Sequence, residues 1–295
     1  MDQDHYANPK ILKQRRMNTK NKKIGIIAGG GELPKQLIKA CQEAKREYFV
    51  IALDNTTEEE TVENTPHCWI HIGKVSAIIK ELKNQNVTDV LLAGRVGRPS
   101  PSSLNLDFGG LKLLIKLSRL DSKGDDKIFS TIIKYIEGYG FDVIGAEEIL
   151  ENLLIKKEVL GQITPDEISL IDISIGTKAA LAIGELDIGQ AVIVQQGQIL
   201  GVEGPEGTDR LVKRCKEFHA EGNGGVLIKV KKPEQDDRVD LPSIGVTTVE
   251  NAHNNNLIGI AVEAGGSLVI DRESVIKKAD ELGIFILGID PKDYQ

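Results

Sequence analysis

The stretch IGIIAGGGELPKQLIKACQEAK, residues Ile24–Lys45, decides the fold of the first half of the chain. The apolar run IGIIA predicts a buried strand, the three glycines predict a tight turn, and apolar residues at helical spacing predict a helix after it. YFVIALD, WIHI and DVLLAG, with a helix over about 74–84, continue the alternation of strand and helix. Because such alternation is typical of a parallel sheet with helices on its faces, we predict a Rossmann-like N-terminal domain.

The second half of the chain predicts a different, mixed α/β domain. AVIVQQGQILGVEG alternates like a hairpin turning near Gly197, and it lies between two helical patterns, EISLIDISIGTKAALAIGEL and EGTDRLVKRCKEFH. The strand GVLIKVKK and a final α/β stretch ending in IFILGID follow. These strands are few and mixed in type, so we expect a compact second domain that is smaller than the first.

The length of 295 residues suits two hydrophobic cores, because single cores stop growing near about 250–300 residues. A charge run followed by the helix start TPDE places the domain boundary near Val159–Thr164. We therefore expect a basic arm over residues 1–22, the Rossmann-like domain over 23–160 and the mixed domain over 161–295.

Composition excludes several classes of protein. The net charge of −7 and the pI near 5.4 argue against a nucleic-acid binder, which needs a basic surface. Three dispersed cysteines favour a reducing cytoplasm, and no apolar run is long enough to span a bilayer. The first 23 residues hold seven Lys or Arg against two Asp, which leaves open a solubilising tail, an extension before a start at Met17, or an arm that contacts anionic lipid.

Two loops of the first domain are candidate anion sites. In AGGGELP, Gly29, Gly30 and Gly31 precede a helix, whose N-terminal N–H groups favour a phosphate, although a plain tight turn explains them equally well. In AGRVGRP, Arg95 and Arg98 leave a buried strand toward the same edge of the sheet, and pairing with surface acids is the alternative. Asp54 closes another strand, where dinucleotide folds bind ribose.

Further polar groups lie at two predicted helix starts. Asp125 and Asp126 begin one helix, where capping explains at least one carboxylate and a metal would need ligands from elsewhere. In the second domain, Thr208 is a good N-cap at a glycine-rich helix start that also favours an anion.

The densest cluster of charge is KKPEQDDRVDLPSIG, residues 231–245, which we call the acidic loop. Pro233 and Pro242 restrict its backbone. Asp236 and Asp240, with Asp237 as a third choice, have the ligand chemistry of Mg²⁺, and Lys229, Lys231 or Lys232 with Arg238 would neutralise phosphate charge. A solvated polar loop is the alternative.

Several of these stretches together resemble one family. AGGGELP, GRVGRP, GDDKIF, EGTDRLVKR, the segment around the acidic loop and LIGIAVEAGGSLVIDRESVIKKADELGIFILGID resemble, in order and from Ile24 onward, the LpxI-type UDP-2,3-diacylglucosamine pyrophosphatases of lipid A synthesis. The acidic loop is the most specific of these motifs.

The resemblance implies hydrolysis of UDP-2,3-diacylglucosamine to UMP and 2,3-diacylglucosamine 1-phosphate (lipid X), with Mg²⁺ or another divalent metal such as Mn²⁺. It also implies a C-terminal catalytic domain, a ligand cleft between the two domains, action at the cytoplasmic face of the inner membrane and a homodimer. The family motif QDxRxDxP assigns the catalytic and metal roles to Asp236 and then Asp240, beside Arg238. The substrate-binding candidates are then Gly29, Gly30, Gly31, Arg95, Asp125, Thr208 and Lys229.

Two other functions remain open from the residues alone. An NAD(P)-dependent oxidoreductase would bind its cofactor through the three glycines and Asp54. A non-catalytic nucleotide-sugar-binding protein would bind the ligand without releasing UMP. Neither function explains the acidic loop.

Overall fold

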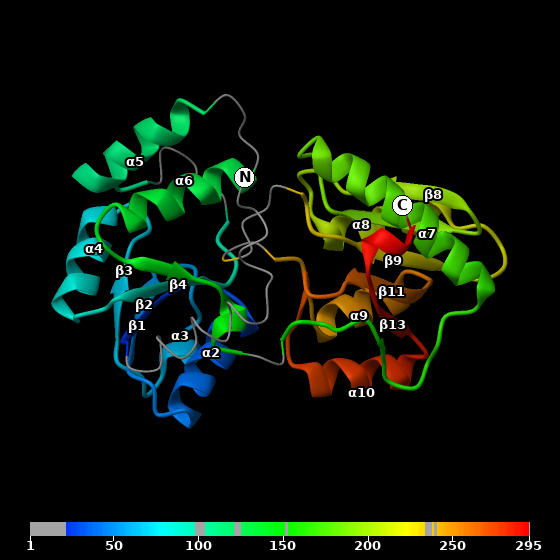
Figure 1. The fold of residues 1–295 in the computed structure, drawn as a ribbon, viewed down its shortest axis with the longest axis horizontal. Helices are drawn as coiled ribbons and strands as arrows, with labels where there is room; N and C mark the ends of the chain where they lie inside the picture. Colours follow the sequence, from blue (N-terminus) through cyan, green and yellow to red (C-terminus); the bar gives the residue numbers. More distant parts are fainter. Residues whose placement is uncertain are drawn as a thin grey trace. The chain divides into compact units, whose positions relative to one another are not determined.

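The computed structural model describes residues 22–97, 104–120, 125–150, 153–233, 238 and 241–294, and for Asp125 and Asp126 it describes the backbone alone. The chain forms two compact units. Unit 1 comprises Met1–Glu151 with Asp236–Asp240, and unit 2 comprises Asn152–Gln235 with Leu241–Gln295 (Figure 1).

Unit 1 is built on a fully parallel sheet. Its strands are β1 (Ile24–Ala28), β2 (Tyr48–Leu53), β3 (His67–Ile70), β4 (Asp89–Ala93) and β5 (Asp142–Ile144). They lie in the order β3-β2-β1-β4-β5, with every pair parallel. The strand order therefore reverses between β1 and β4, and the crevice beyond their carboxyl ends is where open α/β sheets bind ligands.

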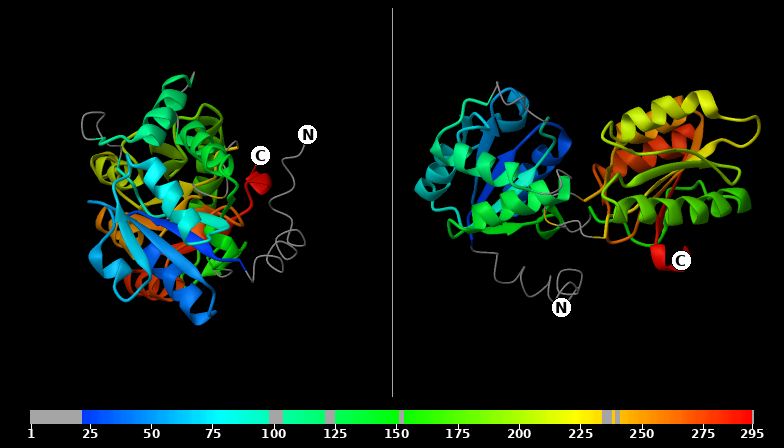
Figure 2. Two further views of the ribbon diagram at one scale, coloured as in Figure 1. Left: turned by 90° about the vertical axis from the view of Figure 1, so that its left-hand side faces the viewer. Right: turned by 90° about the horizontal axis from the view of Figure 1, so that it is seen from above.

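Helices cover both faces of this sheet (Figures 1 and 2). One core joins Ile78, Ile79 and Leu82 of one helix to Ile133 of another and to the apolar strands. These side chains recur at helical spacing, so each helix presents a continuous apolar stripe to the sheet. The helices are α2 (Glu32–Glu43), α3 (Glu59–Val62), α4 (Val75–Asn84), α5 (Phe108–Ser118), α6 (Asp125–Glu137) and the 3₁₀ turn η2 (Ala146–Glu148).

Unit 2 is built on a mixed sheet. Its strands are β6 (Val159–Leu160), β7 (Ala191–Gln195), β8 (Gln198–Val202), β9 (Gly225–Lys229), β11 (Leu257–Glu263) and β13 (Phe285–Ile289). In the order β6-β13-β11-β9-β7-β8, the three central strands β13, β11 and β9 are parallel to one another. The pairs β6–β13, β9–β7 and β7–β8 are antiparallel. A short parallel pair, β10 (Ser243–Ile244) and β12 (Leu268–Val269), contributes Ile244 and Val269 to a hydrophobic core of unit 2.

The helices of unit 2 also divide between two faces. One core packs Ile173 and Ala180 against β7 and β9, and the other packs Leu211, Val249 and Val275 against the opposite face. The helices are α7 (Glu167–Glu185), α8 (Thr208–Cys215), α9 (Val246–Asn254) and α10 (Arg272–Leu282), with the 3₁₀ turns η3 (Lys216–Phe218) and η4 (Pro291–Tyr294). Within the described residues, no helix is both long and apolar enough to cross a bilayer.

The predicted α/β class, with a parallel first sheet and a mixed second sheet, is confirmed. Three details differ. The second sheet has six strands rather than few, and β3 begins two residues before the predicted WIHI because it is a half-exposed edge strand with a weak apolar pattern. The expected division at residue 160 also differs from the observed one after Glu151, since β6 pairs with β13 in the second sheet.

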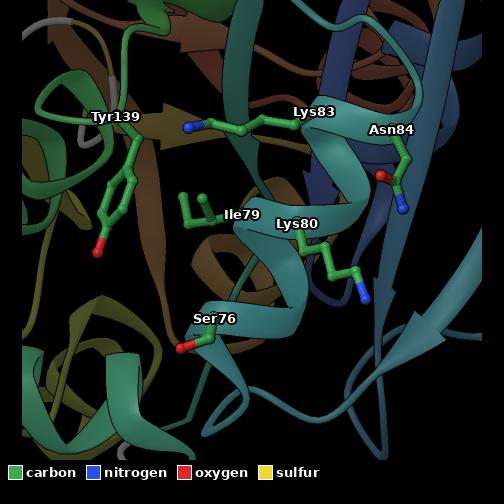
Figure 3. A pocket seen from close by; sticks show the side chains of 6 residues that line it. All are labelled: Ser76, Ile79, Lys80, Lys83, Asn84 and Tyr139. Carbon is green, nitrogen blue, oxygen red and sulfur yellow. The ribbon is translucent and has the colours of Figure 1, made fainter.

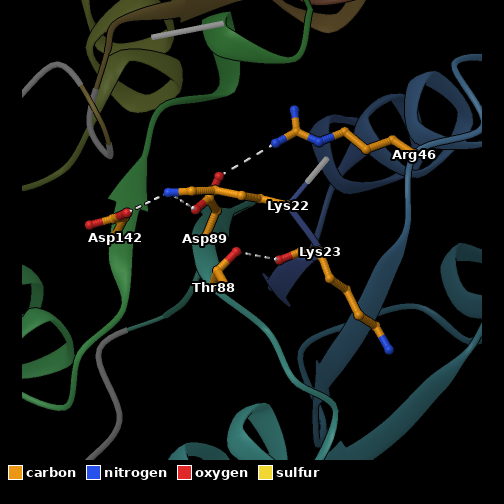
Figure 4. A network of polar contacts seen from close by, with 6 residues as sticks. All are labelled: Lys22, Lys23, Arg46, Thr88, Asp89 and Asp142. Carbon is orange, nitrogen blue, oxygen red and sulfur yellow. Dashed lines mark hydrogen bonds and ion pairs between the residues drawn. The ribbon is translucent and has the colours of Figure 1, made fainter. Parts of the chain in front are cut away.

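An ion-pair cluster lies at the amino ends of the strands of the first sheet, which we call its amino edge (Figure 4). Asp89, the first residue of β4, is 0% exposed. Lys22 Nζ lies 3.2 Å from Asp89 Oδ1 and 2.7 Å from Asp142 Oδ2, and Arg46 Nη2 lies 3.5 Å from Asp89 Oδ2. Burial raises the pKa of Asp89, and the two cations oppose that shift without cancelling it. We call Lys22, Arg46, Asp89 and Asp142 the amino-edge cluster.

Candidate active site

The loops after β1 and β4 lie against each other at the switch point of the first sheet. Gly30 N–H donates to Arg95 O at 2.9 Å, and Arg95 N–H donates to Gly30 O at 2.8 Å. A Cβ on Gly29 would lie 2.6 Å from Arg95 O, and one on Gly94 would lie 2.7 Å from Gly30 O. The glycines therefore serve close backbone packing, and this packing places Arg95 beside the glycine turn.

A carboxylate of the protein itself binds the N-terminus of α2. Gly31 N–H lies 3.2 Å and 3.3 Å from the two carboxylate oxygens of Glu58. Hydrogen bonds from the Glu58 backbone N–H and from Gly31 lower the pKa of Glu58. A helix N-terminus favours an anion, and in this structure the anion at the N-terminus of α2 is the carboxylate of Glu58.

Glu58 was missed in the sequence, which pointed to Asp54 instead. The Asp54 backbone N–H donates to Ile70 O at 3.3 Å, and among the described residues no side-chain contact joins Asp54 to the glycine turn. Glu58 follows β2 in the run TTEEE, where three adjacent acids do not indicate which one binds the helix N-terminus. The useful signal was its position beyond the carboxyl end of the strand next to β1.

The guanidinium of Arg95 is exposed at this edge. A Cβ on Gly31 would lie 3.8 Å from Arg95 Nε, which places the side chain next to the start of α2. Within the described part of the chain, Arg95 has no ion pair or side-chain hydrogen bond. Arginine binds phosphate through two parallel N–H donors, so Arg95 is a cation available to a phosphate at the switch point.

Thr208 is not the predicted N-cap of α8. Gly207, with φ of 82°, occupies that position, and Thr208 is the first helical residue. The Thr208 hydroxyl donates to Glu203 Oε1 at 2.7 Å, and Gln190 N–H donates to Glu203 Oε2 at 3.0 Å. The threonine thus anchors a buried carboxylate beside the helix start, a role that its N-cap propensity did not indicate.

Lysines at the base of the acidic loop are held by unit 2. Lys229 ends β9, is buried, and its Nζ donates to Ser243 O at 3.1 Å. Lys232 Nζ lies 2.8 Å from Asp187 Oδ1. The Lys231 backbone N–H donates to Glu263 Oε2 at 2.8 Å. These contacts fix where the loop leaves the second sheet.

Arg238, in the middle of the acidic loop, belongs to unit 1. Its Nη1 lies 2.6 Å from Glu137 Oε1 at the end of α6, and the side chains of Arg238 and Glu137 are 16% and 37% exposed. This ion pair ties the centre of the loop to a helix about 100 residues earlier in the chain. Asp236, Asp237, Asp240, Arg98 and the side chain of Asp125 lie outside the described residues.

Metal and thiol chemistry find little support in the described residues. No three His, Cys, Asp or Glu side chains there are grouped to hold a metal, and the predicted ligands Asp236 and Asp240 lie outside them. Burial raises the pKa of Cys41 and Cys68 to about 11. Both thiols are therefore protonated near neutral pH and are poor nucleophiles.

The fold and the switch-point loops define a two-unit α/β protein whose first unit is a Rossmann-like sheet with a glycine turn at its switch point. The family model described as the LpxI N-terminal domain matches residues 23–153, and that described as the LpxI C-terminal domain matches 156–287. The chain therefore belongs to the LpxI family. It is 39% identical over 278 residues to the UDP-2,3-diacylglucosamine pyrophosphatase LpxI of Caulobacter vibrioides, an alignment covering 92% of this chain and 99% of the relative.

Proposed function

We propose that this chain hydrolyses the pyrophosphate bond of UDP-2,3-diacylglucosamine, releasing UMP and 2,3-diacylglucosamine 1-phosphate (lipid X), in lipid A biosynthesis. The observation that carries the proposal is the 39% identity, over nearly the whole of both chains, to a relative with that named activity. The enzyme is then a phosphoanhydride hydrolase.

The chain's own cations match the needs of this reaction. Pyrophosphate hydrolysis requires positive groups that stabilise the negative charge on two phosphates as it shifts in the transition state. Arg95 lies at the switch point without an ion-pair partner among the described residues, and Glu137 fixes the direction of the Arg238 guanidinium. Arg95 would bind a phosphate, while Arg238 and Lys229 would stabilise the charge that develops on the leaving group.

Asp236 and Asp240 would hold Mg²⁺ or Mn²⁺, because carboxylate oxygens are the ligands that these ions prefer. A bound divalent ion would neutralise phosphate charge and lower the pKa of a water molecule. We further propose a cytoplasmic enzyme at the inner face of the inner membrane that acts as a homodimer.

The test is release of UMP from UDP-2,3-diacylglucosamine by the full chain, with and without EDTA. We expect release that EDTA abolishes and that Asp236→Ala lowers by at least about a hundredfold. The neighbouring Asp237→Ala is the matched control and should keep most of the activity. Absence of release from the unmodified chain would refute the function, and full activity of Asp236→Ala would refute the residue's role.

A second comparison separates metal binding from loop structure. If Asp240 binds the metal, Asp240→Asn should recover part of its lost UMP release when Mg²⁺ is raised, because the amide is a weaker ligand rather than an absent one. A loss of activity that does not respond to Mg²⁺ would assign Asp240 to the structure of the loop instead.

The contacts of the glycine turn do not favour the alternative of an NAD(P)-dependent oxidoreductase. Glu58 accepts from the N–H of Gly31, which is the donor that a dinucleotide pyrophosphate would need, whereas the phosphate site proposed above relies on Arg95. We expect no binding of NADH in a fluorescence titration.

A further inference from the structure

Helix α5 is an apolar helix with almost no buried apolar side chain. It packs on α4 and α6 of unit 1, and only Gly109 and Gly110 are buried in it. Phe108 is 82% exposed, Leu111 48% and Ile115 43%. Positions i, i+3 and i+7 share one side of a helix, so these three side chains form one exposed apolar stripe. Figures 1 and 2 show α5 at the outer margin of unit 1, beyond α6 from the sheet.

A basic stripe runs beside the apolar one. Lys112, Lys116 and Arg119 are exposed and follow Phe108 by four, eight and eleven residues, which places them next to Phe108 around the helix. Residues 108–120 contain no acid, although the whole chain carries a net charge of −7. Lys116 Nζ lies 5.4 Å from the centre of the Tyr135 ring of α6, so its stem lies along the surface. This local charge is opposite in sign to that of the protein.

Figure 3 shows a hollow beside α4 that has two lysines among its lining residues. This shallow hollow of about 360 Å³ is lined by Lys80 and Lys83 of α4 and by Tyr139. Lys83 Nζ lies 5.4 Å from the centre of the Tyr139 ring. Ser76, which also lines the hollow, accepts a hydrogen bond from Gly109 N–H at 2.8 Å. The hollow therefore adjoins the first turn of α5.

We propose that the exposed side of α5 lies on the surface of an anionic phospholipid bilayer, with Phe108, Leu111 and Ile115 among the acyl chains and Lys112, Lys116 and Arg119 at the phosphates. Apolar side chains flanked by lysine and arginine are the pattern of helices that lie in a membrane interface. An anionic bilayer is the occupant that the two stripes favour, because one surface supplies acyl chains for the apolar stripe and phosphates for the basic stripe.

Helix α7 of unit 2 provides the contrast. Its exposed apolar residues include Ile168 and Ile171, at 44% and 57% exposure. Acidic residues, Glu167 and Glu185, lie at its two ends. Apolar exposure alone is therefore shared by both helices. The charges differ, because α7 has one lysine, Lys178, against three acidic residues, whereas α5 has two lysines and no acidic residue.

The inference names the surface for the membrane contact proposed above and rests on that part of the proposal, not on the hydrolysis. The test is sedimentation of the full chain with vesicles of phosphatidylcholine, with and without phosphatidylglycerol. We expect binding that requires phosphatidylglycerol. Phe108→Ser with Ile115→Ser should weaken it about tenfold or more, and Lys112→Gln and Lys116→Gln about fivefold each. The matched control, Ile168→Ser with Ile171→Ser, should bind like the unmodified chain.

The outcomes separate the two proposals. If the unmodified chain fails to bind vesicles, the membrane contact and the α5 surface are both wrong, whereas UMP release still tests the hydrolysis. If it binds and the α5 variants bind equally well, another segment makes the contact and the inference is overturned. Loss of activity on detergent-dispersed substrate with unchanged vesicle binding would also overturn it, because α5 would then contact the substrate. Circular dichroism checks that each variant is folded.

Discussion

The two ends of the strands in the first sheet, its amino edge and its carboxyl edge, differ in how their charged side chains are paired. At the amino edge, the buried carboxylate of Asp89 forms ion pairs with Lys22 and Arg46. At the carboxyl edge, the guanidinium of Arg95 is exposed and has no ion-pair partner among the described residues. Both edges belong to the same five strands: Asp89 and Asp142 begin β4 and β5, and Arg95 follows the end of β4.

The difference teaches where this sheet is built for stability and where for binding. A buried carboxylate must be paired, because an unpaired buried charge lowers the stability of the folded state. Removing one partner of a buried ion pair costs about 3–5 kcal/mol of stability. An exposed arginine has no such requirement and keeps its donors for a ligand. We therefore expect substitutions at the amino edge to change folding and substitutions at the carboxyl edge to change activity.

The largest expected effect is on stability at the amino edge. Asp89→Ala removes the carboxylate shared by Lys22 and Arg46 and should lower the free energy of unfolding by about 3 kcal/mol. The specific activity of the folded fraction should stay close to that of the unmodified chain. Denaturant unfolding measures the first quantity and UMP release the second.

Two variants sharpen that result. Asp142→Ala, in the exposed part of the same cluster, should cost less than about 0.5 kcal/mol, because surface ion pairs contribute little. Arg46→Met added to Asp89→Ala should recover much of the loss, since the partly buried cation is removed together with its partner. A double variant as unstable as Asp89→Ala would show that cavity formation, not the unpaired charge, causes the loss.

The next largest effect is on catalysis at the carboxyl edge. Arg95→Ala should lower kcat/KM for UMP release by about a hundredfold, close to 2.7 kcal/mol, because a donor to the reacting phosphates is lost. Its unfolding should match that of the unmodified chain. Arg95→Lys should restore only part of the activity, since an ammonium cannot bind a phosphate with two parallel donors. Lost stability without lost activity would remove the contrast between the two edges.

A smaller effect is expected from the glycine turn. Gly31 has φ of 99° and ψ of −177°, a conformation that side chains with a Cβ rarely adopt. Gly31→Ala should therefore lower the free energy of unfolding by about 1–3 kcal/mol. Gly97 has open space where its Cβ would lie and is the matched control, so Gly97→Ala should change stability by less than about 0.5 kcal/mol. Equal stability of the two variants would show that the turn tolerates side chains.

Local sequence patterns predicted most of the strands and helices. They also placed the loops after β1 and β4 next to each other. Strand and helix periodicity found the first sheet, and the rule that ligands lie beyond the carboxyl ends of the strands placed Arg95 near Gly30. The hairpin turn at Gly197 also follows from local alternation, and Gly197 has φ of 81° as such a turn requires. These features depend on residues close together in the chain.

The features that were missed depend on residues far apart. Arg238 contacts Glu137, so the centre of the acidic loop groups with unit 1 although its flanks belong to unit 2. The pairing of β6 with β13 likewise moved the domain boundary. No local pattern encodes a partner about 100 residues away, and an exposed acid such as Glu58 resembles any solvated residue until its backbone donor is known.

The smallest expected effect concerns Glu58, the anion already present at the carboxyl edge. Its pKa is lowered in the folded chain, so its stabilising contribution is present above its ordinary pKa, near 4.5, and is lost as the pH falls through the lower folded value. Glu58→Gln should remove this acid dependence and cost about 0.5 kcal/mol at pH 7, the usual size of a helix-terminus charge at a surface. Unfolding measured from pH 7 to pH 3 checks both expectations. If the variant and the unmodified chain lose stability in parallel over that range, the Glu58 carboxylate does not stabilise the α2 N-terminus, and the carboxyl edge would then have no bound anion of its own.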